Sequence, residues 1–250
     1  NVWVQAQENG YMDMAKWKAC QVDKLPVDTK GMSVYVGFDM SAKIDLTSVA
    51  FILPFKSEEK DAEGEKIIKY IVYSHSFIPN REKLTERKRK DKADYDAWER
   101  MNLLTVTDTP IVDQNAVMKY VKDTCKEQWN IECLCFDPAN AAKLMMDLSD
   151  EGYEVEEVYQ SHKSLNESTQ GFREQVYSGN IIYTYNPLLN FAMSNAVIRK
   201  NQGLIKIDKD ATTQRIDPVD AILCAYKLAL YHEFTQSFLK SIDEYLGSDW

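Results

Sequence analysis

The 250-residue sequence lacks several features that mark common classes of protein. None of its nine glycines falls in a G-x-x-x-x-G-K-[ST] motif, which excludes the phosphate-binding loop of P-loop nucleotide hydrolases from this chain. It has no run of 18 apolar residues and no signal peptide, so we expect a soluble protein with no membrane contact. Positive charge is not in excess either. The formal net charge is −9, so any contact with nucleic acid needs a local basic patch.

Cysteine and histidine are also scarce and scattered. The five cysteines are an odd number without a C-x-x-C pair, so we expect them to be reduced, in a cytosolic compartment, and without zinc. The three histidines are isolated from one another, and we expect structural or solvent-facing roles for them. These residues are Cys20, Cys125, Cys133, Cys135 and Cys224, and His75, His162 and His232.

Hydrophobic periodicity predicts an α/β fold. Alternating residues over 33–39, 46–54 and 67–77 predict three strands with short connections, which form an antiparallel meander. Helical spacing follows over 113–129, then a strand at 131–137 and a helix at 138–152. Further expected elements are a strand at 153–160, a helix at 168–177, a short strand at 180–185, a helix from Pro187, a hairpin turning at Gln202-Gly203 and a long helix at 217–234. The order predicts a central mixed sheet, the meander plus parallel strands, flanked by helices.

Carboxylates stand where these strands end. Asp39 ends the first strand, Asp137 ends the fourth, and Asp45 precedes the second strand. Ligands of open α/β sheets bind beyond the carboxyl ends of the strands. If the first and fourth strands are parallel neighbours, Asp39 and Asp137 meet at one edge. Taken alone, Asp39 also fits an ordinary turn residue, and Asp137 fits a helix N-cap.

Two more carboxylates, Asp217 and Asp220, open the last predicted helix within "RIDPVDAILCA". Their spacing of three residues places both on one helical face. An alternative interpretation makes Asp217 the N-cap, Pro218 the first helical residue and Asp220 the partner in a capping box. The segment alone does not choose between capping and ligand binding.

Taken together, the carboxylates favour a metal centre. Converging carboxylates without a neighbouring cation raise one another's pKa, and a divalent cation removes that cost. Oxygen-only ligands favour Mg²⁺ or Mn²⁺ over zinc. Two such ions about 4 Å apart can hold a phosphodiester, activate a water and stabilise the leaving oxygen.

The order of these motifs resembles the RNase H-like nucleases, including Holliday-junction resolvases. More closely, the chain is similar to the C-terminal nuclease domain of the large terminase subunit of tailed bacteriophages. The resemblance covers nearly the whole chain in the family's order. It rests on "NVWVQA", "GFDMSAKIDLTSVA", "DYDAWERMNLLTVT", "CFDPANAAKLMMDLSDEGYEVEEVYQ", "NPLLNFAMSNAVI" and "RIDPVDAILCA".

This resemblance implies an RNase H-like fold and a metal-dependent endonuclease that cuts concatemeric phage DNA during packaging. The catalytic metal ligands carried over are Asp39 and Asp137, with Asp217 and Asp220 from the late helix. Asp45 corresponds to an additional acidic position in some members. The choice between Asp217 and Asp220 stays open, because this chain has both. The implied cofactors are two Mg²⁺ or Mn²⁺ ions.

The resemblance also implies partners and a domain division. The partners are double-stranded DNA, the terminase ATPase domain, the small terminase subunit and the portal protein, in the cytoplasm of the infected host. We expect residues 1–30 to be an irregular arm or linker remnant, anchored by Trp3 and Trp17, and residues 31–250 to be the nuclease domain. We also expect the ATPase to precede Asn1 in the full protein.

Candidate DNA contacts come from the densest basic run, "REKLTERKRKDK". Its central residues suit phosphate binding, although a solvated face is the ordinary reading of such a run. The segment 198–209 fits either a surface hairpin or a wing beside the site. The candidate phosphate contacts are Arg87, Lys88, Arg89, Lys90, Lys163 and Arg215.

Two other functions remain possible at this stage. The fold could serve a resolvase or transposase, or the chain could be a non-catalytic docking module whose acidic residues only cap helices. Metal-dependent nicking separates the nucleases from the docking module, and preference for DNA junctions separates the two nucleases.

Overall fold

The computed structural model describes residues 9–40, 46–209 and 215–234. Asp45 and Trp3 therefore lie outside the described residues. The strands are β1 (Gln21–Val22), β2 (Met32–Asp39), β3 (Thr47–Lys60), β4 (Lys66–Ile78), β5 (Leu104–Val106), β6 (Trp129–Phe136), β7 (Val155–Glu157), β8 (Ile181–Thr184), β9 (Ile198–Asn201) and β10 (Leu204–Ile207). The helices are α1 (Met14–Ala19), α2 (Arg81–Asp91), α3 (Tyr95–Arg100), α4 (Gln114–Cys125), the 3₁₀ turn η1 (Pro138–Asn140), α5 (Ala142–Asp150), α6 (His162–Tyr177), α7 (Pro187–Asn195) and α8 (Asp217–Ala229).

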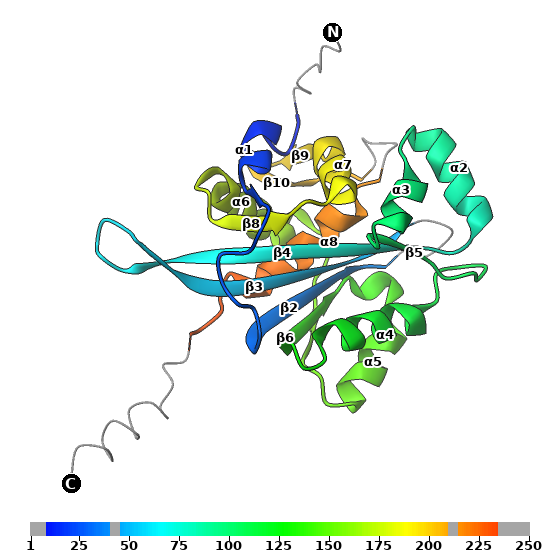
Figure 1. The fold of residues 1–250 in the computed structure, drawn as a ribbon, viewed down its shortest axis with the longest axis horizontal. Coiled ribbons are helices and arrows are strands. Elements are labelled where there is room, and N and C mark those ends of the chain that lie inside the picture. The colour runs from blue at the N-terminus through cyan, green and yellow to red at the C-terminus, as the bar shows by residue number, and fades with distance from the viewer. Residues whose placement is uncertain (1–8, 41–45, 210–214, 235–250) are drawn as a thin grey trace.

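A mixed sheet with the order β1-β8-β4-β3-β2-β6-β7 forms the centre of the molecule (Figure 1). β2, β3 and β4 form the predicted antiparallel meander, and β6 and β7 add in parallel beside β2. β5 pairs in parallel with the last residues of β4. The predicted arrangement of a meander plus parallel strands is confirmed.

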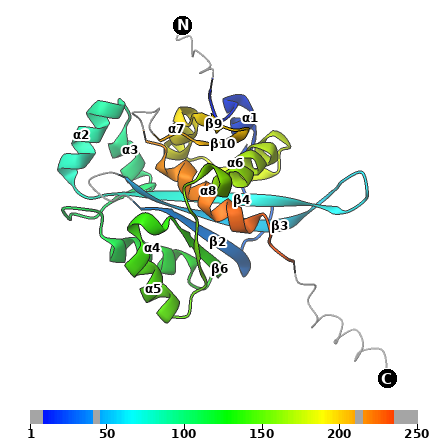
Figure 2. The same ribbon diagram turned by 180° about the vertical axis from the view of Figure 1, so that it is seen from behind.

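Helices cover both faces of this sheet (Figures 1 and 2). Alternate residues of β3 supply the two separate cores, with Ala50 and Ile52 on one face and Phe51 and Leu53 on the other. The first face packs against α1, α6, α7 and α8, and the second packs against α4 and α5. Burial on both faces explains why most of β3 is apolar.

The last helix, α8, lies directly on the sheet because β2 has a glycine at the crossing. A Cβ at Gly37 would lie 2.0 Å from the Ala221 carbonyl oxygen and 2.6 Å from the Ala225 backbone nitrogen. Only a residue without a side chain permits this approach. The close contact brings the first turn of α8 next to the end of β2, where Asp39 lies.

Several segments differ from the sequence-based expectation; the helix expected at 168–177, for example, is α6 and begins at His162. The segment 81–91, read as a charged loop, is the helix α2, which begins where the Asn80 side chain accepts a hydrogen bond from the Lys83 backbone N–H. The N-terminal arm contains the helix α1, although Trp17 anchors it as predicted, with its side chain fully buried. The predicted polar turn after β3 is shorter than expected, because β3 extends to Lys60 and β4 already begins at Lys66.

The predicted hairpin turn agrees with the structure. The hairpin of β9 and β10 turns at Gln202 and Gly203, both with positive φ, as a two-residue hairpin turn requires. All five cysteines are free and buried. No helix among the described residues is long and apolar enough to span a membrane.

Candidate metal centre

The carboxylates Asp39 and Asp137 follow neighbouring parallel strands. Phe38 of β2 is paired in register with Phe136 of β6, and their rings stack with centroids 4.1 Å apart. Asp39 is the last residue of β2 and Asp137 immediately follows β6, so the two lie together at the carboxyl ends of these strands, which is one edge of the sheet. The predicted neighbourhood of β2 and β6 is thus observed.

Their local surroundings differ. Asp39 is buried, with 7% of its surface exposed. Asp137 is half-buried and N-caps η1, where its Oδ1 accepts a hydrogen bond from the Ala139 backbone N–H at 3.2 Å. The capping interpretation of Asp137 is therefore correct as far as one oxygen is concerned. That bond leaves a second carboxylate oxygen to consider for ligand binding.

The third and fourth carboxylates come from the first turn of α8. Asp217 is the first residue of the helix, the N-cap position is Ile216, and no side-chain hydrogen bond caps α8 within the described part of the chain. The alternative that Asp217 and Asp220 form a capping box is therefore wrong. Asp220 is 2% exposed, although capping gives no reason for its burial.

Burial and mutual repulsion shift the acidity of these groups. Burial raises the pKa of Asp217 to about 7, and the charge of Asp39 is the second cause. Burial also raises the pKa of Asp220 to about 7, while Lys209 opposes the shift and Asp39 adds to it. Perturbed carboxylates grouped at one edge of a sheet are typical of a functional site.

Lys209, which sequence analysis did not single out, lies between two of these acids. Its Nζ donates a hydrogen bond to Asp39 Oδ1 at 3.0 Å and lies 3.2 Å from Asp220 Oδ2. Desolvation lowers the pKa of Lys209, but the charges of Asp220 and Asp39 outweigh it and raise the pKa above its ordinary value. The only signal in the sequence was its place in the segment 198–209, beside the predicted hairpin.

Cys224, one helical turn beyond Asp220, shows that the acids share one region. Burial raises the pKa of its thiol, and the carboxylates of Asp39, Asp220 and Asp137 all act on it in the same direction. The Cys224 thiol is therefore close enough to Asp39, Asp137 and Asp220 for the charges of all three to shift its pKa.

The carboxylate oxygens are the kind of ligand that a hard divalent cation prefers, but the described side chains are not positioned as a complete set of ligands. Asp220 Oδ2 is buried and makes no hydrogen bond in the described structure, since its approach to Lys209 has the distance of an ion pair without hydrogen-bond geometry. Carboxylate oxygens are the preferred ligands of Mg²⁺ and Mn²⁺. No three His, Cys, Asp or Glu side chains among the described residues are arranged as a ready set of ligands. Asp45, the fifth predicted ligand, lies outside the described residues.

Comparison with known proteins identifies the family. The family model described as "Terminase large subunit, endonuclease domain" matches residues 1–233. The chain belongs to this family. The chain is 24% identical over 252 residues to Protein YmfN of Escherichia coli (strain K12), covering 98% of this chain and 54% of that protein. It is 26% identical over 215 residues to the large terminase subunit of Enterobacteria phage HK97, covering 85% of this chain and 40% of that protein.

The fold agrees with this assignment. The crystal structure of the HK97 bacteriophage large terminase superimposes with a TM-score of 0.73 at 24% identity, over 88% of this chain and 43% of that one. The RNase H-like fold class implied by the sequence is thereby confirmed. The chain spans about half the length, or less, of the curated relatives it matches.

In this terminase-family domain the predicted basic residues do not form one exposed cluster. Arg87 is 8% exposed and points inward from α2. Lys88 pairs with Asp96 and lies 3.9 Å from Asp94. Arg89 and Lys90 are exposed beside a shallow hollow. The expectation that all four residues are available to phosphates is therefore wrong for Arg87.

The basic helix is nevertheless near the right edge. Since β4 runs parallel to β2, α2 leaves the sheet at the edge where β2 ends, as Figures 1 and 2 show. Of the other two candidates, Lys163 is exposed in the first turn of α6. Arg215 is half-buried, and its charge lowers the pKa of Asp217, so it lies at the carboxylates.

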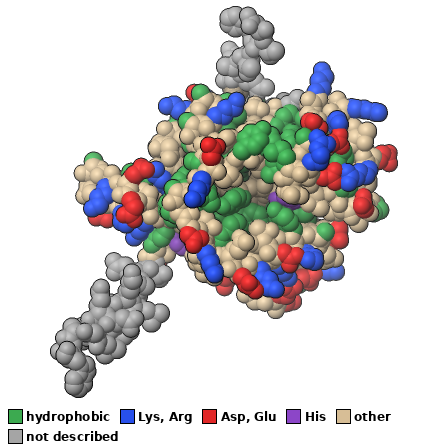
Figure 3. Space-filling view, in the orientation of Figure 1, with side chains coloured by type: hydrophobic (Ala, Val, Ile, Leu, Met, Phe, Trp, Pro, Cys, Tyr) green, Lys and Arg blue, Asp and Glu red, His purple; other side chains and the backbone are tan. Residues whose placement is uncertain are grey.

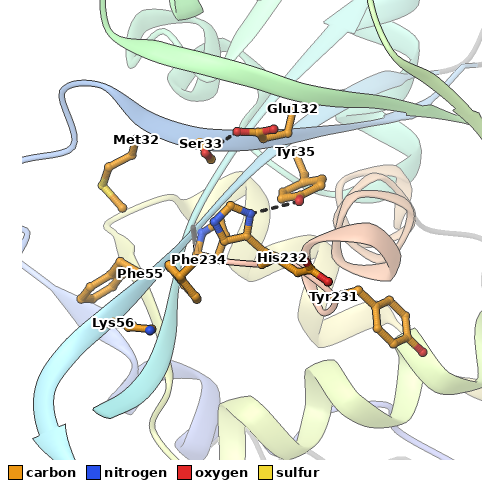
Figure 4. Close-up of a pocket in the computed structure, with 11 residues that line it drawn as sticks. Met32, Ser33, Tyr35, Phe55, Lys56, Glu132, Tyr231, His232 and Phe234 are labelled. Carbon is orange, nitrogen blue, oxygen red and sulfur yellow. Dashed lines mark hydrogen bonds between the residues drawn. The ribbon is translucent and has the colours of Figure 1, made fainter. Parts of the chain in front are cut away.

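Two hollows elsewhere in the domain lie away from these acids. One, of about 670 Å³, lies at the opposite end of β2, where Tyr35 and His232 are hydrogen-bonded (Figure 4). The other, of about 330 Å³, is lined by aromatic side chains such as Tyr73 and Trp129, on the face seen in Figure 3. Tyr185 also lines it and is 59% exposed.

The shifted acids predict a pH dependence of stability. Because the folded pKa of Asp220 is about 7 and its unfolded value is about 4, the folded state binds more protons between these values. The charged form therefore costs stability above pH 7, and this cost is relieved as the pH falls. In EDTA, we expect the wild type to gain about 1 kcal/mol relative to Asp220→Asn between pH 8 and pH 6.

Urea unfolding at the two pH values measures this difference. Asp150→Asn, which removes an exposed carboxylate at the end of α5, is the matched control and should follow the wild type. Parallel stability changes in the wild type and Asp220→Asn would show that Asp220 does not titrate between pH 6 and pH 8 in the folded protein.

Proposed function

We propose that this domain is a metal-dependent endonuclease that hydrolyses phosphodiester bonds of double-stranded DNA. Asp39, Asp137 and one or both of Asp217 and Asp220 are the proposed ligands of two Mg²⁺ or Mn²⁺ ions. The ions, when bound, supply an activated water and stabilise the leaving oxygen. Family membership supports the reaction class, and the chemistry of the acids supports the metal.

The observation that carries the proposal is the meeting of Asp39 and Asp220 on a single positive charge. Lys209 Nζ lies 3.0 Å from one carboxylate and 3.2 Å from the other, so these two acids already share a cation-binding position. Asp137 stands at the same sheet edge. Buried acids are costly unless they are paired or bind metal, and the two buried carboxylates, Asp39 and Asp220, share the single charge of Lys209.

The sheet and α8 each position two of the acids. The strand ends hold Asp39 and Asp137 on the rigid sheet, and α8 presents Asp217 and Asp220 from a helix that is packed on β2. Ligands mounted on strands and helices keep their geometry better than ligands on loops. Arg215 adds a positive charge beside Asp217, which suits the approach of a phosphate.

The proposed substrate and partners follow from the family. The relative from phage HK97 is a large terminase subunit, and this supports concatemeric phage DNA as substrate, cut during genome packaging. The proposed partners are the terminase ATPase domain, the small terminase subunit and the portal protein, in the cytoplasm of the infected host. Residues 31–250 as the nuclease domain, after an arm or linker at 1–30, remain part of the proposal.

Nicking of supercoiled plasmid tests the function. We expect the purified domain to convert plasmid to open circles in Mn²⁺ or Mg²⁺ and to lose this activity in EDTA, with little sequence preference. Gel electrophoresis of several plasmids measures both properties. Cleavage that survives the chelator would contradict the metal mechanism. Strong preference for four-way junctions would favour a resolvase instead.

The exposed pair on α2 gives a prediction about DNA binding. Replacing Arg89 and Lys90 with Ala should weaken binding and reduce the slope of log K against log salt by about 1 to 2, since each phosphate contact contributes about 0.9. Fluorescence anisotropy over a salt series measures it. Lys119→Ala, on the exposed side of α4, is the control for loss of surface charge. An unchanged slope would assign α2 to an ordinary solvated surface.

A further inference from the structure

Lys209 lies between two of the acids that are proposed to bind metal. The side chain of Asp220 is 2% exposed and that of Asp39 is 10% exposed, while the side chain of Lys209 is 43% exposed. The lysine thus reaches from solvent into a pair of buried carboxylates. Its ammonium group is their positive partner in the described structure.

This position is the one that a divalent cation needs. Mg²⁺ lies about 2.1 Å from its oxygen ligands, so an ion held by Asp39 Oδ1 and Asp220 Oδ2 must occupy the space between them. The Lys209 ammonium already touches both oxygens, at 3.0 and 3.2 Å. Two cations cannot share these two atoms at such distances, because their mutual repulsion is strong where water is excluded.

Lys209 is also able to leave. It follows β10 by two residues, and its ammonium is carried on a flexible four-carbon stem. Because part of the side chain is in contact with solvent, the ammonium can swing outward without opening the core. The backbone of the β9–β10 hairpin need not move for this exchange.

We propose that Lys209 is a resident counter-ion of Asp39 and Asp220, which a divalent cation displaces when it binds. Lys209 then sets the metal concentration at which the nuclease becomes active. It keeps the two acids neutralised and in place at lower concentrations. This inference rests on the proposed function, because it takes the carboxylates as the metal ligands.

Calorimetric titration with Mn²⁺ tests the inference independently of cleavage. Lys209→Met keeps the stem and removes the charge, and we expect it to bind Mn²⁺ about tenfold more tightly than the wild type. Its melting temperature in EDTA should fall, and the rise on adding Mn²⁺ should be larger. Lys200→Met makes the same change on the exposed part of the same hairpin and should match the wild type.

A second variant guards against a folding defect. Lys209→Arg keeps the positive charge and should bind Mn²⁺ no more tightly than the wild type, so the contrast with Lys209→Met isolates the charge. The Mn²⁺ concentration that gives half-maximal nicking should shift to lower values in Lys209→Met alone.

The outcomes separate this inference from the function on which it rests. Equal or weaker Mn²⁺ binding by a folded Lys209→Met protein, while the wild type binds metal and nicks DNA, overturns the counter-ion role and leaves the nuclease intact. A wild type that neither binds Mn²⁺ nor nicks DNA overturns the proposed function itself.

Discussion

The Asp39→Asn variant should nick plasmid DNA about 10³-fold more slowly than the wild type in Mn²⁺. The substitution preserves the shape of the side chain and removes the charge that would bind metal. Metal-ion catalysis contributes several kcal/mol to such reactions, and each 1.4 kcal/mol is a factor of ten in rate. Initial rates of nicking over a range of Mn²⁺ concentrations measure the effect.

The same variant should remain folded. The amide oxygen of the new side chain could still accept the hydrogen bond that Lys209 donates to Asp39, and the loss of one acid relieves the repulsion on Asp217 and Asp220. We expect a change of no more than about 1 kcal/mol in unfolding free energy in EDTA. Asp150→Asn is the control for removal of a carboxylate elsewhere. An active but destabilised Asp39→Asn protein would reduce Asp39 to a structural turn residue.

The strand-end acids could be predicted because sheet geometry is regular. Apolar alternation fixes where β2 and β6 end, and any two neighbouring parallel strands bring their ends to one edge. Asp39 and Asp137 follow from that rule alone. The role of the acids in the first turn of α8 was harder to predict, because Asp217, Pro218 and Asp220 fit a capping box equally well. Only the position of Ile216 at the N-cap excludes that interpretation.

Lys209 could not be predicted from periodicity. It lies after a hairpin and before a segment outside the described residues, where no hydrophobic pattern fixes the direction of a side chain. Its role depends on a contact between residues 170 positions apart. Such contacts are set by the packing of α8 and the hairpin on the sheet, which local sequence does not specify.

The helix α2 was missed for a different reason. Its sequence "REKLTERKRKD" is nearly all charged, so the hydrophobic stripe that marks an amphipathic helix is absent. Leu84 is its one aliphatic residue, yet Arg, Lys and Glu have good helix propensity and Asn80 is a favourable N-cap. Propensity and capping carried the signal that periodicity did not. The inward position of Arg87 follows from the helix, since residues three apart share a face with Leu84.

The position of the acids relative to one another depends on the crossing of β2 and α8. Asp39 is two residues after Gly37 on β2, and Asp220 is next to Ala221 on α8. The space for a side chain at Gly37 is filled by the Ala221 carbonyl, the Ala225 backbone nitrogen and the Ala225 methyl group, at 2.0, 2.6 and 2.9 Å. Two of these atoms are backbone and cannot turn aside as a side chain does. The helix itself would have to move.

Gly37→Ala should therefore destabilise the domain by about 3 kcal/mol or more, since overpacking a rigid contact costs at least about 1 to 3 kcal/mol. The protein that remains folded should bind Mn²⁺ more weakly, because a displaced α8 carries Asp220 away from Asp39. Urea unfolding and calorimetric titration measure the two effects. Gly171→Ala is the matched control, because the new methyl group would meet only the Tyr226 ring at 3.4 Å and lies inside α6, where alanine is favoured over glycine by about 1 kcal/mol. A Gly37→Ala protein with wild-type stability and metal affinity would show that the contact between β2 and α8 does not position the acids.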